Sequence, residues 1–131
     1  GFAEARLLLC EAGEPPERDA RLRDAKNACV EALRYSNVSR PGMPEAMRLQ
    51  GTYEWLRGGH QAACKWWRRS LALAEKQGQR YDEGMTHLEI GKRRNDCEHL
   101  ERAIGIFSEI GAEFDLARAR EALAEIGKSS I

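Results

Sequence analysis

The sequence predicts an all-α fold made of antiparallel helix hairpins, and both its composition and its loop signals support this. Apolar residues make up 42% of the chain and charged residues 32%, which is typical of a folded protein. Most of them are Ala, Leu, Glu and Arg, which are strong helix formers, whereas β-branched residues are scarce. Glycines and prolines divide the chain into segments that suit helices and are longer than ordinary strands.

Apolar residues recur at steps of three and four along these segments, as one buried face of a helix requires. Leu100, Ala103 and Phe107 give an example, and no stretch alternates with a period of two for long. Short connections make consecutive helices antiparallel neighbours. The sequence thus predicts about seven helices, near residues 2–12, 17–35, 44–57, 60–77, 80–92, 96–110 and 113–127.

A chain of 131 residues is expected to form a single helical-repeat domain over residues 1–131. Its helices group into units of roughly 1–39, 44–77 and 80–110, followed by a terminal helix at 113–127. The chain begins without Met and ends abruptly. We therefore expect it to be a fragment of a longer protein, whose chemistry lies outside this fragment.

The charge balance argues against nucleic acid as a partner. The chain has 21 basic and 21 acidic side chains, whereas nucleic-acid-binding modules usually concentrate a basic excess on one face. Lys65, Arg68 and Arg69 beside Trp66 could stack on a nucleic acid and neutralise it. Nearby Glu and Asp residues compensate this cluster, so nucleic-acid binding is not expected.

No membrane partner is expected either. The longest uncharged apolar run, Leu7–Cys10, is far too short to span a bilayer, and no signal peptide is visible. The four cysteines are well separated and form no C-x-x-C motif. Each lies among apolar helical positions, so we expect reduced, buried thiols in a cytoplasmic protein. They are Cys10, Cys29, Cys64 and Cys97.

We expect no catalytic residue, no metal and no cofactor, so this fragment is predicted not to be an enzyme. His99 follows Cys97 by two positions, and residues so spaced on a helix do not share a face. Carboxylates such as Glu121 and Glu125 have the spacing of solvated ion pairs. The glycines form no phosphate-binding loop, and the serines lie in no nucleophile motif.

A short pattern recurs along the chain: a small residue, a large one four positions later, and a small one three after that. Ala63, Trp67 and Ser70 show it best, and Gly51 precedes them on the preceding helix. Small residues let two helices approach, and Trp67 is predicted to fill the core between them. The other copies are Ala25, Cys29 and Ala32 and, more weakly, Asp96, Leu100 and Ala103.

In this pattern the chain resembles the tetratricopeptide repeat, a helix-hairpin unit of about 34 residues. Gly51, Ala63 and Trp67 stand where that family has its glycine, its alanine and its large aromatic residue. The resemblance implies a right-handed solenoid and a role in protein–protein interaction. The chain departs from the pattern at Pro15 and Pro16, which are expected to interrupt the first unit.

The second half shows a narrower resemblance, carried by Trp66–Glu75, His99–Ala103 and Phe114–Arg120. These stretches are similar to the helical-repeat tails of large bacterial signalling proteins. Such proteins join an ATPase module to a nucleotide cyclase, kinase or DNA-binding output domain. The resemblance implies a scaffold or regulatory module within a signalling protein, and no ATPase or cyclase motif occurs in this chain.

In the tetratricopeptide family the first helix of each unit lines a concave groove, so partner contacts are expected there. Glu45, Arg48, Thr52 and Trp55 lie on one stripe of the helix predicted at 44–57. They are the predicted groove residues for a protein, a peptide or another domain of the same chain. The alternative is a sensor whose groove admits a small molecule or peptide and controls an attached output domain. Exposed end helices also predict some self-association.

Overall fold

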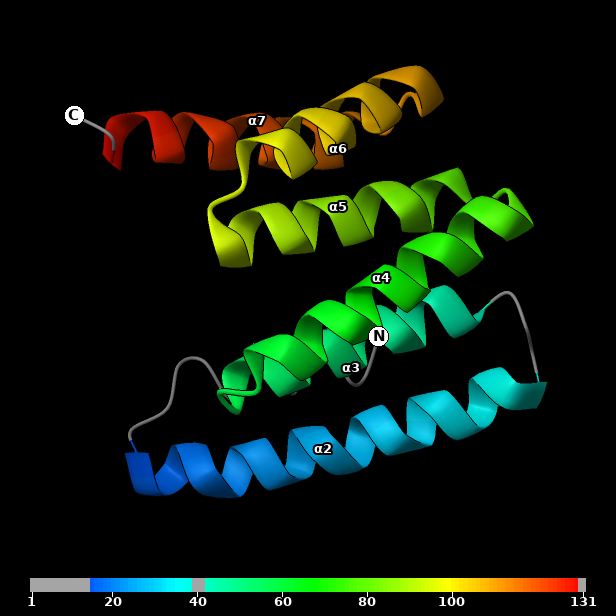
Figure 1. The fold of residues 1–131 in the computed structure, drawn as a ribbon, viewed down its shortest axis with the longest axis vertical. Helices are drawn as coiled ribbons and strands as arrows, with labels where there is room; N and C mark the ends of the chain where they lie inside the picture. Colours follow the sequence, from blue (N-terminus) through cyan, green and yellow to red (C-terminus); the bar gives the residue numbers. More distant parts are fainter. Residues whose placement is uncertain (1–14, 39–41, 130–131) are drawn as a thin grey trace. The chain divides into compact units, whose positions relative to one another are not determined.

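The computed structural model describes residues 15–38 and 42–129, and over these residues it contains six α-helices and no strand (Figure 1). The predicted all-α fold is therefore confirmed for the described part of the chain. The helix predicted at 2–12 lies outside the described residues, so the count of seven remains a prediction. The helices are α2 (Pro15–Val38), α3 (Met43–Leu56), α4 (His60–Gln77), α5 (Arg80–Arg94), α6 (Cys97–Ile110) and α7 (Glu113–Ser129).

The first described helix begins at a pair of prolines, where the sequence pattern predicted an interruption. The helix predicted at 17–35 starts two residues earlier than expected, with Pro15 and Pro16 as the first residues of α2. Whether the prolines interrupt the first unit stays a prediction, because residues 1–14 lie outside the described residues. Proline is well tolerated in the first turn of a helix, where its missing N–H would have no intrahelical partner.

The end of α5 was also placed too early. The sequence predicted a loop from Lys92, but the helix continues to Arg94 and ends at Asn95, which has left-handed backbone angles of φ 51° and ψ 46°. Its N–H donates to the carbonyl of Gly91, as in helices that end on a left-handed residue. The basic last turn is favoured there because it faces the negative end of the helix dipole.

The chain divides into two compact units at the Ser70–Leu71 bond within α4. The first unit contains α2, α3 and α4 as far as Ser70. The second contains the rest of α4 together with α5, α6 and α7. Among the described residues, no helix combines the length and the apolar character that crossing a membrane requires.

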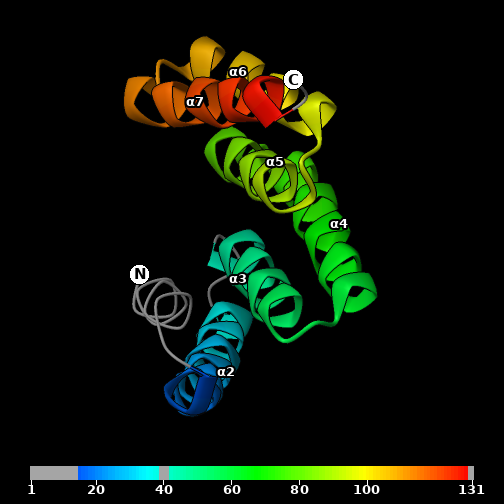
Figure 2. The same ribbon diagram turned by 90° about the vertical axis from the view of Figure 1, so that its left-hand side faces the viewer.

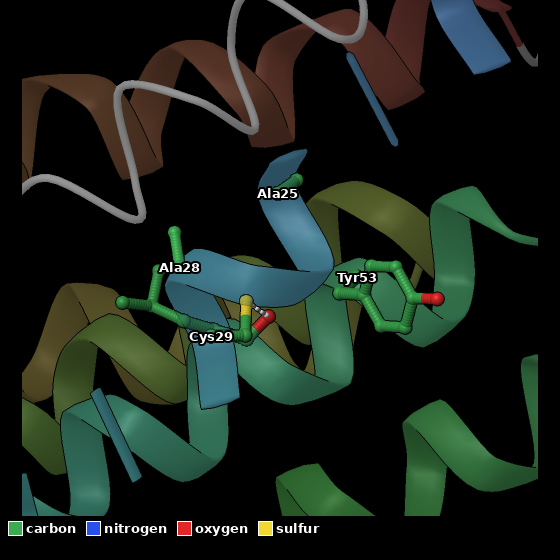
Figure 3. Close-up of a cluster of buried hydrophobic side chains, with 5 residues drawn as sticks. Ala25, Ala28, Cys29 and Tyr53 are labelled. Carbon is green, nitrogen blue, oxygen red and sulfur yellow. Dashed lines mark hydrogen bonds between the residues drawn. The ribbon is translucent and has the colours of Figure 1, made fainter. Parts of the chain in front are cut away.

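In the first unit α2 packs against α3 through small side chains. Ala25, Ala28 and Cys29 of α2 are buried together with Tyr53 of α3 (Figure 3). Small residues let the two helix backbones approach closely, and the Cys29 thiol donates a hydrogen bond to the Leu49 carbonyl at 3.6 Å. Burial raises the pKa of Cys29 to about 12, so this thiol stays protonated at neutral pH.

The packing of α4 on α3 centres on Trp67, which is completely buried. Its indole lies over Gly51 of α3, where even a methyl group would collide with the ring. The Trp67 Nε1–H donates to the Arg48 carbonyl at 3.1 Å, and the Ser70 hydroxyl donates to the Pro44 carbonyl at 2.7 Å. The predicted core role of Trp67 and the predicted close approach at Gly51 are both confirmed.

In the second unit α5, α6 and α7 lie side by side (Figures 1 and 2). Two glycines of α5 admit large side chains of α6: Gly84 faces Phe107, and Gly91 faces Leu100. Around these contacts the buried core consists of Leu88, Leu100, Ala103, Phe107 and Ala119.

The third copy of the sequence pattern does not repeat the geometry of the best one. Asp96, aligned with Ala63, lies outside α6 as its N-cap, and its carboxylate accepts hydrogen bonds from the backbone N–H groups of Glu98 and His99. Ala63, by contrast, is buried within α4. The alignment of Asp96 with Ala63 was therefore wrong in structural terms.

Candidate interaction site

The four predicted groove residues lie on α3, but they differ greatly in how much surface they offer. Glu45 and Trp55 are half-buried, whereas Arg48 is 5% exposed and Thr52 is 2% exposed. The Thr52 hydroxyl donates to the Arg48 carbonyl at 3.2 Å. Two of the four side chains are thus buried, and whether this stripe contacts a partner stays a prediction.

The Trp55 side chain packs against two neighbouring rings. It stacks on His60 with a centroid distance of 3.8 Å and an interplanar angle of 16°, and it lies tilted against Trp67 at 5.6 Å. This aromatic group joins the end of α3 to the start of α4. Trp55 therefore stabilises the hairpin in addition to any contact that its exposed part makes.

A second surface lies in the second unit, between the C-terminal end of α5 and the middle of α7. Two open hollows of about 240 Å³ and 260 Å³ share Lys92, Ala122 and Glu125, so they form one continuous depression. We call it the α5–α7 groove. Its remaining lining residues are Asn95, Arg118, Glu121 and Ile126.

The α5–α7 groove combines an apolar strip with charges of both signs. Ala122 and Ile126 supply the apolar part, and both also pack on the core of the second unit. Lys92 is an exposed cation, and Glu125 is held at 3.5 Å from Lys128. The groove can therefore hold an apolar side chain flanked by charged groups.

The sequence pattern did not indicate this groove, because its two sides are far apart in the chain. Lys92 lies at the end of the helix predicted at 80–92, and Ala122 lies within the helix predicted at 113–127. The one available signal was the family resemblance, which places the first helix of each unit along the concave face. It would have pointed to α5 and α7 as well as to α3.

Exposed large hydrophobic residues lie at the junction of α6 and α7 and at the start of α5. Phe114 is 77% exposed, and Tyr81 and Ile110 are also exposed. The Tyr81 hydroxyl donates to Asp115 at 2.9 Å, and the Arg118 guanidinium lies 5.9 Å from the Phe114 ring centroid. The hydrogen bond joins the start of α5 to the start of α7, whereas the contact of Arg118 with Phe114 lies within α7.

Two histidines form a direct contact between α5 and α6. The Nδ1 atoms of His87 and His99 are 2.9 Å apart, and their ring centroids are 5.1 Å apart. His87 is 4% exposed, and its pKa is lowered to about 4, first by desolvation and then by the charges of His99, Arg102 and Arg80. Sequence reasoning considered each histidine only with its neighbours on the same helix, so it missed this pair.

Within residues 15–38 and 42–129, no group of three or more His, Cys, Asp and Glu side chains is placed to hold a metal ion. The histidine pair is therefore a two-residue contact in this part of the chain.

The cysteines do not all have the buried environment that was predicted. Cys29 is buried and Cys64 half-buried, but Cys97 is exposed, and Cys10 lies outside the described residues. The prediction was wrong for Cys97, because this residue is the first of α6 and precedes the apolar face that begins at Leu100.

Comparison with known proteins gives no further guide to this site. No family model, no curated protein and no solved structure matches the chain at a significant level.

Proposed function

We propose that this chain is a tetratricopeptide-like helical-repeat module that binds a segment of a partner protein, as a scaffold or regulatory part of a larger signalling protein. The observation that carries the proposal is the α5–α7 groove. Its two hollows open to solvent, and it offers Ala122 and Ile126 beside Lys92 and Glu125. The module binds and positions its partner and carries out no catalysis itself.

The composition of the groove indicates what kind of segment it takes. Apolar contact with Ala122 and Ile126 supplies most of the affinity, since burial of apolar area contributes roughly 25 cal/mol per Å². Exposed ion pairs each contribute only about 0.2–1 kcal/mol, so Lys92 and Glu125 mainly select and orient the segment. A suitable segment has an apolar side chain with an acidic residue on one flank and a basic residue on the other.

The stripe of Glu45, Arg48, Thr52 and Trp55 is a second proposed contact region, in which Glu45 and Trp55 contribute most of the accessible surface. A sensor for small molecules is supported less well. Small-molecule sites are mostly enclosed and hold convergent polar groups, whereas the two hollows of the α5–α7 groove are open to solvent.

The test is selection from a displayed library of random peptides on the folded chain, followed by affinity measurement. Ala122→Trp fills the groove, and we expect it to weaken the selected peptides at least tenfold. Ala124→Trp is the matched control, because Ala124 is exposed and points away from Ala122 on the same helix. It should leave the affinity unchanged.

Ala122 also packs on the core, so a second variant is needed to distinguish loss of peptide binding from misfolding. Lys92→Glu changes an exposed side chain and should weaken peptides that carry an acidic flank, without lowering the helix content measured by circular dichroism. The proposal is refuted if no peptide is enriched. It is equally refuted if the enriched peptides bind the wild type, Ala122→Trp and Lys92→Glu with the same affinity.

A further inference from the structure

The histidine pair has a chemistry that peptide binding does not use. An Nδ1–Nδ1 distance of 2.9 Å is a hydrogen bond, so one imidazole donates its N–H and the other accepts with a lone pair. His87 belongs to α5 and His99 to α6, and the bond therefore joins the two helices of one hairpin. We propose that the histidine pair is an acid-sensitive contact that holds α5 on α6 and is lost when both rings are protonated.

Protonation acts on this bond in two steps. When one ring carries a second proton, it becomes an imidazolium and still donates to its neutral neighbour. When both rings are protonated, each Nδ1 carries a hydrogen and no acceptor remains. The bond is then replaced by two positive charges whose rings lie 5.1 Å apart. His87 is buried and His99 is partly exposed, so the ring of His87 is the one shielded from water.

The surroundings of His87 make its own protonation unfavourable in the closed hairpin. Two cations act on it, Arg80 from α5 and Arg102 from α6, and both raise the cost of a further positive charge. Both arginines are paired with carboxylates: Arg80 with Glu83 and, at 2.6 Å, with Glu109 of α6, and Arg102 with Glu98 at 3.0 Å. These carboxylates are therefore already engaged by arginine guanidinium groups.

The charged groups that shift the pKa of His87 lie on α5 and α6, and none of them lies on α4 or α7. On α7, Arg118, Glu121 and Glu125 line the α5–α7 groove beside Lys92. On the second-unit part of α4, Glu75 and Lys76 are exposed. The charges that act on His87 thus come from α5 and α6, and they are positive. The buried ring gains water around its charge only when the two helices separate.

The sign of the pH dependence follows from the lowered pKa of His87, about 4 in the folded chain against 6.5 for an ordinary histidine. In the unfolded or opened state His87 binds a proton more readily than in the folded chain. The stability that the folded chain gains from keeping His87 neutral is therefore complete above pH 6.5 and is lost as the pH falls towards 4. Opening would uncover Leu88, Leu100 and Phe107, which are buried in the same hairpin.

The experiment is urea unfolding of the whole chain at pH 7.5 and at pH 5.5, where few carboxylates titrate. Between these values we expect the folding equilibrium constant of the wild type to fall about tenfold through His87. His87→Gln keeps a hydrogen-bonding side chain that does not titrate, and it should lose most of this fall. His60→Gln is the matched control for a histidine outside the pair: it removes the ring that stacks on Trp55 and so lowers the stability at both pH values, but it should keep the tenfold fall between them.

A second variant and two spectroscopic or exchange measurements test the proposal independently of the His87→Gln variant. If His87→Gln does not fold, His99→Gln serves instead, and it too should reduce the fall in stability. Histidine ¹⁵N NMR of the wild type at pH 7.5 should show one ring of the pair protonated at Nδ1. Hydrogen exchange should show lost protection of α5 and α6 at pH 5.5. The proposal is overturned if both glutamine variants keep the tenfold fall, or if both rings are protonated only at Nε2 at pH 7.5.

Discussion

The two hairpins α3–α4 and α5–α6 use the same packing principle with different polar contacts. In each, a glycine on the first helix admits a large side chain of the second: Gly51 admits Trp67, and Gly84 admits Phe107. The α3–α4 hairpin adds hydrogen bonds from an indole and a hydroxyl to backbone carbonyls. These donors do not titrate near neutral pH, whereas the α5–α6 hairpin relies on two histidines.

The comparison shows that a shared packing principle does not give a shared response to conditions. Two helices can pack closely because glycine has no side chain, and this close packing does not depend on pH. The polar contacts beside it decide whether acid changes the hairpin. Acid should therefore act on α5 and α6 before it acts on the contact between Trp67 and α3.

The largest expected loss of stability comes from substitution in the core of the α3–α4 hairpin, and two adjacent tryptophans provide the test. Trp67→Ala should lower the free energy of unfolding by about 3–5 kcal/mol, because it removes a fully buried ring and its hydrogen bond. Trp66 is half-buried, and the Arg69 guanidinium lies 4.6 Å from its ring centroid. Trp66→Ala should cost only about 1 kcal/mol. Urea unfolding followed by circular dichroism measures both, and equal losses would contradict the assigned core.

A smaller change in stability is expected from replacing glycines of the α5–α6 hairpin, and it tests whether the packing there requires glycine. In Gly91→Ala the new Cβ would lie 2.5 Å from Leu100 Cγ, and we expect a loss of about 1–3 kcal/mol despite the better helix propensity of alanine. Gly105 of α6 is exposed, with no atom near its added Cβ. Gly105→Ala should therefore stabilise the chain by about 0.5–1 kcal/mol. Thermal unfolding distinguishes the two substitutions by the sign of the shift.

The smallest effect concerns the helix starts of the second unit. Asp96→Ala removes the only side-chain acceptor seen at the start of α6 in the described structure, and it should cost about 1 kcal/mol. Gln79 occupies the same position before α5 but makes no side-chain cap, so Gln79→Ala should leave α5 capped as before. If both substitutions cost the same in urea unfolding, the capping role of Asp96 is wrong.

The helices could be predicted because their causes are local. The ends of α3, α4 and α6 fall within one residue of their predicted places, since glycine, asparagine and aspartate signal turns and caps. Gly111, with φ 73°, closes α6 where the sequence placed a loop. The core role of Trp67 was predictable for a similar reason, because its spacing from Ala63 and Ser70 defines one face.

The candidate site was less predictable because it depends on which helices meet. Arg48 has the long charged side chain of a surface residue, yet it is buried. Lys92 and Ala122 are brought together only by the packing of α7 beside α5. His87 and His99 face each other because of the way α5 and α6 cross. No spacing within a single helix reveals such a contact.

The different environments of Cys29 and Cys97 have a practical consequence. Alkylating reagents attack the thiolate, which Cys29 scarcely forms at neutral pH because its pKa is raised to about 12. Cys97 is exposed at the start of α6, two residues before His99. A maleimide dye should thus attach to Cys97 in preference to Cys29. The dye would then report on the environment of the histidine pair without any engineered attachment site.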